Sequence, residues 1–500
     1  MSAKIKEQKM VVIGPERGKA RVYIIIGGCW GDEGKGKVAA FYAAVADLVI
    51  RATGGANAGH TVYINGKKIA LHLVPGGIGN SKTICLIGQG TVIDFDILEE
   101  EIEQIYEYGV EDVMDRLKIS GTANVLFPYH KALDKLHEWL RLNKVGTTAK
   151  GIGPAYADET TRFGIKVYDL MLPVGELTEK IREVLSLHKP LFDAYNDWRK
   201  KEIKREAKRK KKKNTDLLFT EEEWAGYQDF FVHPEELAIK YHEYGKCFSK
   251  AIVNGHQLVQ SFLNNPSKTI VVEGAQSVCL SLKEGHYPMV TSSDANTLGT
   301  LSGAHLNHKD VTEVILIAKA YFSKVGQGIF PSEFKSHIDA NGKLTPYNPE
   351  DAYEGDIYRD ENGEYGATTK RPRRTGAFDG VLLKNSVQKS GADYLCINCI
   401  DSIGMMGEKY GKIKICYAYD YQGQQIDYYP DDINLTGEVP TPKYIVFEGG
   451  WKITKKMKNY ESFPELAKVF IGMIEEITRC KVKYIGVGPK NEDMIVRDDV

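Results

Sequence analysis

Residues 21–37 read RVYIIIGGCWGDEGKGK, and this stretch decides the fold class. Its first part, Arg21 to Ile26, is rich in β-branched residues and predicts a strand. A glycine-rich turn follows at once, and residues 37–46 have the pattern of a helix start. Residues 47–53 (DLVIRAT) then predict a second strand. The order strand, loop, helix, strand is typical of a parallel sheet in an α/β fold.

Further short apolar runs extend this pattern along the chain, and helical patterns separate several of them. These runs are residues 83–87, 269–272, 313–318, 392–397, 412–417 and 482–487. We therefore expect one large α/β domain over residues 21–500 rather than a string of modules. Residues 1–20 are expected to form a polar N-terminal extension, and residues 197–232 a charged insertion.

The composition is that of a globular protein, with 42% hydrophobic and 27% charged residues. The net charge of −1 gives no general reason to expect a nucleic-acid or membrane partner. The basic run 199–213 is an exception, and we interpret it as a solvated surface helix, with a nucleic-acid contact or nuclear-import signal as the alternative. No apolar run approaches the ~20 residues of a membrane span, and the first 20 residues lack the apolar core of a secretory signal.

The eight cysteines are scattered, mostly in apolar runs, which favours reduced thiols and a cytoplasmic protein. Cys396 and Cys399 form a CxxC pair, but the sequence has no second pair at metal-binding spacing. A zinc or redox site is therefore the weaker interpretation of this pair.

The glycine-rich loop has the chemistry of a phosphate-binding site. Glycines allow backbone N–H groups to point at phosphate oxygens, the following helix N-terminus adds a favourable dipole, and Lys35 can neutralise charge. The usual pattern is GxxxxGK[ST], whereas here the spacing from Gly28 to Gly34 is one residue longer and Gly36 replaces the Ser/Thr. Asp32 and Glu33 are unusual beside a triphosphate unless one of them binds a metal or exchanges a proton.

At WGDEGKGK (residues 30–37) the chain resembles the adenylosuccinate synthetase family, and the resemblance continues in family order from about residue 21 to 498. The matching blocks are residues 54–61, 145–148, 151–156, 273–276, 287–293, 324–326, Pro331 and 366–376. The resemblance implies a central, mostly parallel sheet with helices on both faces. It also implies a ligase that joins L-aspartate to IMP with GTP through a 6-phosphoryl-IMP intermediate, giving adenylosuccinate, GDP and phosphate.

The resemblance assigns the chemistry to particular residues. A hypoxanthine oxygen is a poor nucleophile until N1 loses its proton, and Asp32 matches the family's base. Lys35 and His60 match the groups at the γ-phosphate, where charge develops, and Gln276 matches the amide that orients the purine. Magnesium is expected at the Asp32 side chain and the Gly59 carbonyl.

The remaining expected contacts are also carried by matching positions. Nucleotide contacts are expected at Gly31, Gly34, Lys35, Gly36, Gly59, His60, Thr61, Asp401, Gly488 and Pro489. IMP contacts are expected at Asp32, Asn57, Thr148, Arg162, Gln276 and Thr291. Aspartate contacts are expected at Thr368, Thr369, Arg371 and Arg373, because arginine forks bind carboxylates bidentately. Arg162 matches an arginine that reaches IMP in the neighbouring subunit, which implies a homodimer.

Two departures from the family leave the phosphoryl donor open between GTP and ATP. Cys399 stands where the family usually has Lys, and Gly486 where Ser or Thr is common. The alternative is a 2-aminoadenylosuccinate synthase that acts on (d)GMP, with ATP or dATP as donor. Asp32 favours IMP, because viral enzymes of that kind typically carry Ser there. A guanine-nucleotide switch or nucleic-acid-binding protein is a third possibility, but it gives the IMP and aspartate blocks no role.

Overall fold

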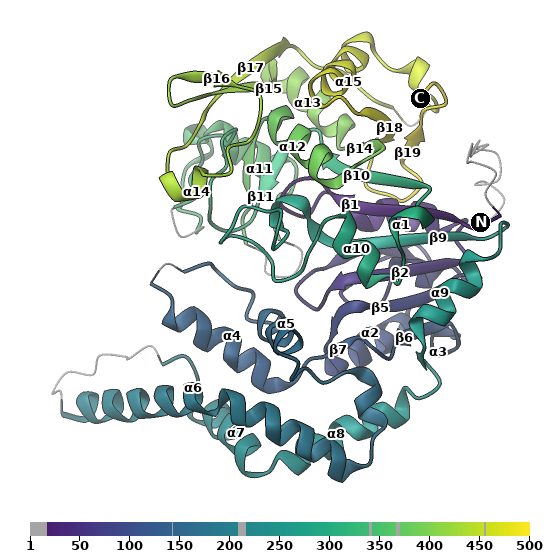
Figure 1. Ribbon diagram of the computed structural model, residues 1–500. Coiled ribbons are helices and arrows are strands. Elements are labelled where there is room, and N and C mark those ends of the chain that lie inside the picture. The colour runs from purple at the N-terminus through teal and green to yellow at the C-terminus, as the bar shows by residue number, and fades with distance from the viewer. Residues whose placement is uncertain (1–17, 143, 209–216, 340–342, 367–370, 455–456) are drawn as a thin grey trace.

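An 11-stranded sheet forms the centre of the protein, and Figure 1 shows it as a computed structural model with helices on either side. The structure describes residues 18–142, 144–208, 217–339, 343–366, 371–454 and 457–500. The strands run in the order β19-β18-β14-β10-β1-β9-β2-β5-β6-β8, and β7 pairs with β5. They are β1 (Arg21–Gly27), β2 (Leu48–Gly54), β5 (Ile84–Ile93), β6 (Leu117–Ser120), β7 (Asn124–Val125), β8 (Ile252–Val253), β9 (Thr269–Ser277), β10 (Glu313–Lys319), β14 (Tyr394–Asn398), β18 (Lys481–Gly486) and β19 (Met494–Val496).

Every pairing in this sheet is parallel except that of β18 with β19. The expected fold class, a large α/β domain with a mostly parallel sheet, is confirmed. The helices are α1 (Lys35–Ala43), α2 (Phe95–Glu107), α3 (Val113–Arg116), α4 (Pro128–Leu140), α5 (Ile152–Thr161), α6 (Val174–Lys208), α7 (Glu221–Val232), α8 (Pro234–Cys247), α9 (Gly255–Leu263), α10 (Thr297–Gly303), α11 (Glu354–Glu361), α12 (Gly380–Ser390), α13 (Ile400–Tyr410), α14 (Ile433–Thr436) and α15 (Glu465–Thr478).

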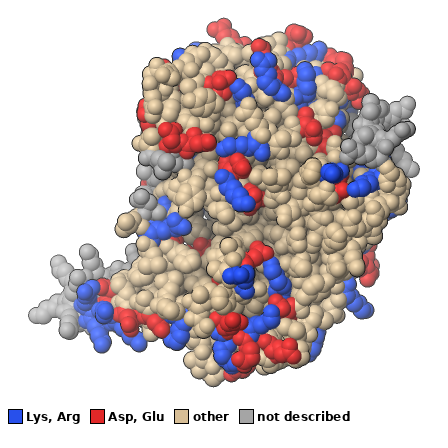
Figure 2. All heavy atoms as spheres, viewed as in Figure 1, with Lys and Arg blue, Asp and Glu red and all other residues tan. Residues whose placement is uncertain are grey.

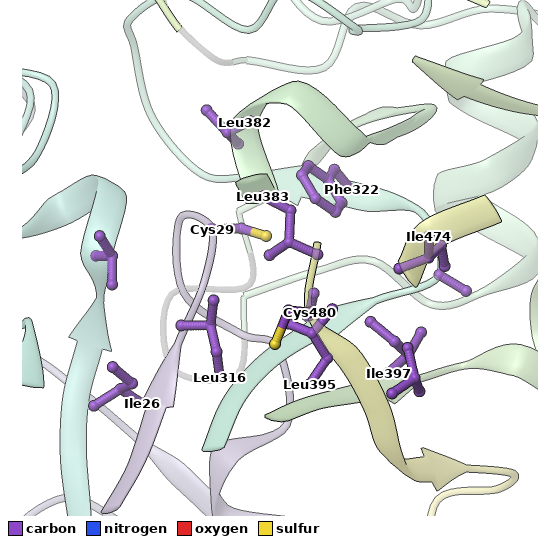
Figure 3. Packing of buried hydrophobic residues seen from close by; sticks show 14 of the residues in the cluster. Ile26, Cys29, Leu316, Phe322, Leu382, Leu383, Leu395, Ile397, Ile474 and Cys480 are labelled. Carbon is purple, nitrogen blue, oxygen red and sulfur yellow. The ribbon is translucent and has the colours of Figure 1, made fainter. Parts of the chain in front are cut away.

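The side chains of β1 alternate between two hydrophobic cores, because successive residues of a strand point to opposite faces. Ile24 and Ile26 join the core that packs against α12, α13 and α15. Tyr23 and Ile25 join the other core, with α1 and α2. Figure 3 shows part of the first core, with Leu383 of α12, Leu316 of β10 and Ile26 of β1 in the same cluster. Burial on both faces explains why these strands have continuous apolar sequences.

Smaller sheets carry the other strands. The hairpin β3 (His60–Ile64) and β4 (Lys67–Leu71) follows the second strand, and β11 (Phe322–Lys324) pairs with β12 (Arg374–Gly376). The predicted run 412–417 is a strand, but it belongs to a four-stranded sheet instead of the central one. That sheet contains β13 (Phe378–Asp379), β15 (Lys412–Tyr421), β16 (Gln424–Ile426) and β17 (Thr441–Glu448).

A helical arm formed by α6 and α7 extends away from the sheet (Figure 1). The described part of the basic run lies in α6, where Arg199 pairs with Glu221 and Arg205 with Glu202. Figure 2 shows basic and acidic side chains mixed along this end of the molecule. Residues 209–213 of the run lie outside the described residues, and the insertion 197–232 stays a prediction. Within the described chain, no helix combines the length and hydrophobicity that a membrane crossing needs.

Candidate active site

Several of the expected site blocks meet at the carboxyl ends of the central strands. In a parallel sheet these ends lie along one edge, and ligands bind in the crevice outside them. Strand β1 leads into the glycine-rich loop, and its neighbours β9 and β10 end at Ser277 and Lys319. Strand β14 ends beside them at Asn398. Residues far apart in the sequence therefore converge around the loop.

Glu33 organises the loop from inside. Its carboxylate accepts hydrogen bonds from the backbone N–H groups of Cys29 (3.1 Å) and Gly31 (2.8 Å) and from Ser277 Oγ (2.5 Å). It also pairs with Lys35 Nζ at 2.7 Å. Burial raises the pKa of this carboxyl, but Lys35 and the hydrogen bonds outweigh that effect and lower the pKa overall. Glu33 is therefore ionised, and its role in holding the loop differs from the metal-binding or proton-transfer role that the sequence suggested for Asp32 or Glu33.

Glycines in and after the loop permit close packing against the helix. Gly34 caps α1 with φ 91°, a left-handed conformation that favours glycine. The helix begins at Lys35, two residues earlier than the sequence pattern indicated. A Cβ on Gly36 would lie 3.0 Å from His60 Cβ and 3.1 Å from the Thr61 carbonyl. The glycine that replaces the usual Ser/Thr thus lets His60 approach the phosphate loop.

His60 lies in a buried polar cluster. Its Nδ1 is 3.3 Å from Arg51 Nη1 and 3.6 Å from Glu273 Oε2. Burial, reinforced by the Arg51 charge, holds the pKa of His60 well below its usual range, so the imidazole is neutral. Burial also raises the pKa of Glu273 to about 7 although Arg51 opposes it. In the described structure His60 Nε2 is buried and has no hydrogen-bond partner.

Two expected IMP residues contact each other. Gln276 Nε2 donates to Asn57 Oδ1 at 3.1 Å, and Gln276 Oε1 accepts from Ser293 Oγ at 3.3 Å. Gln276 adopts φ 55°, which is uncommon for a residue with a side chain and frequent at functional sites. Thr291 lies two residues before Ser293, and its backbone is held by the Leu280 carbonyl.

Asp32 and Arg373 form a salt bridge, with 2.7 Å between Oδ2 and Nη2. The expected base and an expected aspartate ligand therefore meet across 341 residues of chain, from position 32 to position 373. The Asp32 side chain is 39% exposed, whereas that of Arg373 is only 12% exposed. Arg371 lies nearby in sequence and is exposed. Thr368 and Thr369 lie outside the described residues.

The expected base pocket lies on the other side of the loop. Asp401 is in the first turn of α13, and burial raises the pKa of its carboxyl. Lys37 Nζ donates to the carbonyls of Gly488 (2.7 Å) and Asp493 (2.9 Å), which fixes the segment that includes Pro489. Asn398 Nδ2 donates to the Glu33 carbonyl at 2.7 Å. Asn398 thus joins the two halves of the site, a role that sequence reasoning missed.

The structure explains one departure from the family. A Cβ on Gly486 would lie 2.1 Å from Asn398 Oδ1 and 3.0 Å from Lys37 Nζ. Glycine at this position therefore allows Asn398 to reach the phosphate loop. Cys399 adopts φ 64° before α13 and packs against the hydrophobic core.

The segment that includes Thr148 and Arg162 approaches the site at one end only. A Cβ on Gly153, near the start of α5, would lie 2.8 Å from Ser292 Oγ. Tyr156 Oη in the same helix donates to the Gly90 carbonyl at 2.5 Å. Thr148 is exposed before the helix, and Arg162 is exposed at its far end with φ 70°. The described contacts link neither residue to the loop of Asp32.

The model of the adenylosuccinate synthetase family matches residues 24–495. The chain belongs to the adenylosuccinate synthetase family. It is 37% identical to the adenylosuccinate synthetase of Acetivibrio thermocellus over 474 residues, which cover 95% of this chain and 99% of the relative. It is likewise 37% identical to that of Caldicellulosiruptor bescii over 481 residues, 96% of this chain and all of the relative.

Solved structures agree with this family. A fully ligated adenylosuccinate synthetase from Plasmodium falciparum has a TM-score of 0.73 and 30% identity, and covers 95% of this chain and 99% of its own. The succinoaminodeoxyadenylate synthetase of cyanophage S-2L has a TM-score of 0.52 at 18% identity, over 95% of each chain, and shows a shared fold only. The family assignment confirms the expected activity: a GTP-dependent ligase that joins aspartate to IMP.

Proposed function

We propose that this protein makes adenylosuccinate with Asp32 as the base. Asp32 takes the N1 proton of IMP while the 6-oxygen bonds to the γ-phosphorus and GDP leaves. The aspartate amine then bonds to C6 while the C6–O bond breaks, and one amine proton leaves with the oxygen as hydrogen phosphate. The observation that carries this proposal is the contact of Asp32 with Arg373, which places the base beside an arginine expected to bind the substrate aspartate.

The charge that develops on the γ-phosphoryl group requires donors nearby. Lys35 at the start of α1 and the free Nε2 of His60 would supply them. Gly31, Gly34 and Gly36 leave the loop backbone accessible for this purpose. The glycines, Lys35, Gly59, His60 and Thr61 together form the proposed phosphate site.

IMP would be held by Asn57, Gln276 and Thr291, and the contact of Gln276 with Asn57 supports this grouping. Thr148 would also bind the phosphate group of IMP. Arg162 would reach the site of a neighbouring subunit in a homodimer, and its exposed position at the end of α5 is compatible with that role. Aspartate would be bound by Thr368, Thr369, Arg371 and Arg373.

Guanine is the base that Asp401 suits, because a carboxylate accepts from its N1–H and 2-amino group. The fixed segment at Gly488 and Pro489 would line this base. We therefore propose that Asp401 recognises the guanine base of GTP, and an assay with ATP in place of GTP tests this role.

The donor set at the loop suits magnesium, which binds carboxylate and carbonyl oxygens together with substrate phosphates. The Asp32 carboxylate and the Gly59 carbonyl would hold it, and the ion would neutralise phosphate charge. The eight free thiols suit a reducing compartment, and we propose the cytoplasm.

An activity assay with every combination of purine nucleotide and phosphoryl donor tests the function. The purified protein is incubated with aspartate, magnesium and each pairing of IMP or dGMP with GTP or ATP, and products are identified by mass spectrometry. We expect adenylosuccinate from IMP and GTP. Turnover of dGMP with none of IMP would replace this proposal by the 2-amino product. Full-rate GTP hydrolysis without IMP and aspartate would indicate a nucleotide switch instead.

A further inference from the structure

Arg373 contacts a buried glutamate, Glu364, that has no role in the ligase chemistry described above. Glu364 is 3% exposed and precedes the aspartate loop. Its Oε2 is 2.6 Å from Arg373 Nη1, whereas Asp32 contacts the other terminal nitrogen, Nη2. One planar guanidinium group therefore bridges two carboxylates, one buried and one facing the site.

The other oxygen of Glu364 is tied to the central sheet. Glu364 Oε1 accepts from Lys319 Nζ and from Tyr321 Oη, both at 2.6 Å. Lys319 is the last residue of β10, next to the strand that leads into the phosphate loop. Burial raises the pKa of Glu364, but Lys319 and Arg373 outweigh it and lower the pKa to about 2. The carboxylate is therefore ionised.

The backbone adds a second link between the two residues. Arg373 N–H donates to the Glu364 carbonyl at 2.9 Å, and Gly366 N–H donates to the Arg371 carbonyl at 2.8 Å. The segment that follows α11 therefore pairs with the segment that precedes β12, with Glu364 on the first and Arg373 on the second. The side-chain contact then decides where the guanidinium group of Arg373 points.

We propose that Glu364 is a positioning residue for the aspartate step. It holds Arg373 through Nη1, so that Nη2 faces Asp32 and the substrate carboxylate. This inference rests on the proposed roles of Arg373 and Asp32. The geometry needs an acid with two acceptor oxygens, one for Lys319 and one for Arg373. A glutamine would turn an N–H group toward one of these cations.

The test compares Glu364→Gln with Glu333→Gln. Glu333 is the matched control, because it pairs with the adjacent Arg374 (Nε to Oε1, 2.7 Å), which contacts the carbonyls of Gly326 and Gly328 instead of Asp32. Since misplacement of a substrate-binding group by about 1 Å can cost 100-fold, we expect Glu364→Gln to raise KM for aspartate by roughly 10- to 100-fold. KM for IMP should change by less than about threefold. Glu333→Gln should leave KM for aspartate unchanged.

A double-mutant cycle shows whether Glu364 acts through Arg373. In an Arg373→Gln background, Glu364→Gln should raise KM for aspartate no further, because the side chain that it positions is gone. The proposal would be overturned if the two substitutions raised KM for aspartate multiplicatively in the double variant. It would also be overturned if Glu364→Gln raised every KM equally, or if Glu364→Gln and Glu333→Gln had equal effects. If Glu364→Gln does not fold, Glu364→Gln with Lys319→Met removes both buried charges, and the same selective rise is expected.

The wild-type protein separates this proposal from the proposed function. If it makes no adenylosuccinate from IMP, aspartate and GTP, the proposed function fails before Glu364 is tested. If it makes adenylosuccinate and Glu364→Gln has the KM of the wild type for aspartate, only the positioning role fails.

Discussion

Replacing Glu33 with glutamine should weaken the phosphate loop before any substrate binds. The substitution keeps the size of the side chain but removes the charge that faces Lys35 at 2.7 Å. Glutamine Oε1 can still accept from the N–H of Gly31 or from Ser277 Oγ. Its amide nitrogen, however, is a donor and must then face the ammonium group, so the buried pair is broken.

The size of the effect follows from burial. Glu33 is 2% exposed, so solvent does not screen the pair. Breaking a buried ion pair lowers the free energy of unfolding by about 3–5 kcal/mol. Because the hydrogen bonds to Oε1 survive in Glu33→Gln, we expect the lower end of this range, about 3 kcal/mol. Unfolding entropy is about 2.1 cal/mol/K per residue. For 500 residues, Tm should therefore fall by about 3 °C.

The pH dependence has a definite sign. Burial raises the pKa of Glu33, but Lys35 and the hydrogen bonds outweigh that effect and hold the pKa below the ordinary glutamate value of 4.5. The unfolded chain therefore binds this proton at higher pH than the folded one. The stabilisation is complete well above pH 4.5 and is lost as pH falls through the lower folded value. As the pH is lowered through this range, the difference in Tm between the wild type and Glu33→Gln should therefore become smaller.

Thermal unfolding followed by circular dichroism at several pH values checks both statements. Ser277→Ala is the matched control, since it removes one hydrogen bond to Glu33 and keeps the charge pair. We expect it to cost about 1 kcal/mol and to show no such narrowing. A Tm for Glu33→Gln within about 1 °C of the wild type at neutral pH would refute the role of Glu33 in holding the loop.

The site and its metal give further predictions. Asp32→Asn should lower kcat by roughly 100-fold or more with little change in Tm, because the side chain is partly exposed; steady-state assays that find kcat within tenfold would exclude Asp32 as base. Gly486→Ser should raise KM for GTP and lower the free energy of unfolding by about 1–3 kcal/mol, because the new Cβ would lie 2.1 Å from Asn398 Oδ1. In Gly472→Ser the new Cβ meets open space, so KM for GTP should not change. Chelation of magnesium should abolish phosphate release, and added MgCl2 should restore it; activity that survives exhaustive chelation would contradict the metal site.

Much of the fold could be predicted from local sequence. The apolar run of β1 and the glycines after it predicted the first strand and loop, because periodicity and turn chemistry are local properties. The run 412–417 was correctly predicted as a strand. Its place in a separate sheet could not be predicted, since pairing partners lie far apart in sequence.

Family blocks indicated most of the candidate site, but not the residues that hold it together. Glu33, Asn398 and Glu364 match no expected ligand, and each is buried with partners from distant segments. A buried acid is recognisable only by what surrounds it. Asp32, His60 and the other expected ligands stay predictions until substrates are bound.

The sequence by itself determined the family, the reaction and the order of the blocks, because each block is a continuous stretch whose residues can be compared directly. Only the tertiary structure decided which charges meet. Asp32 faces Arg373, and Glu364 ties Arg373 to Lys319 at the end of β10. The physical reason is that a parallel sheet brings the carboxyl ends of its strands to one edge, so groups hundreds of residues apart come within hydrogen-bonding distance.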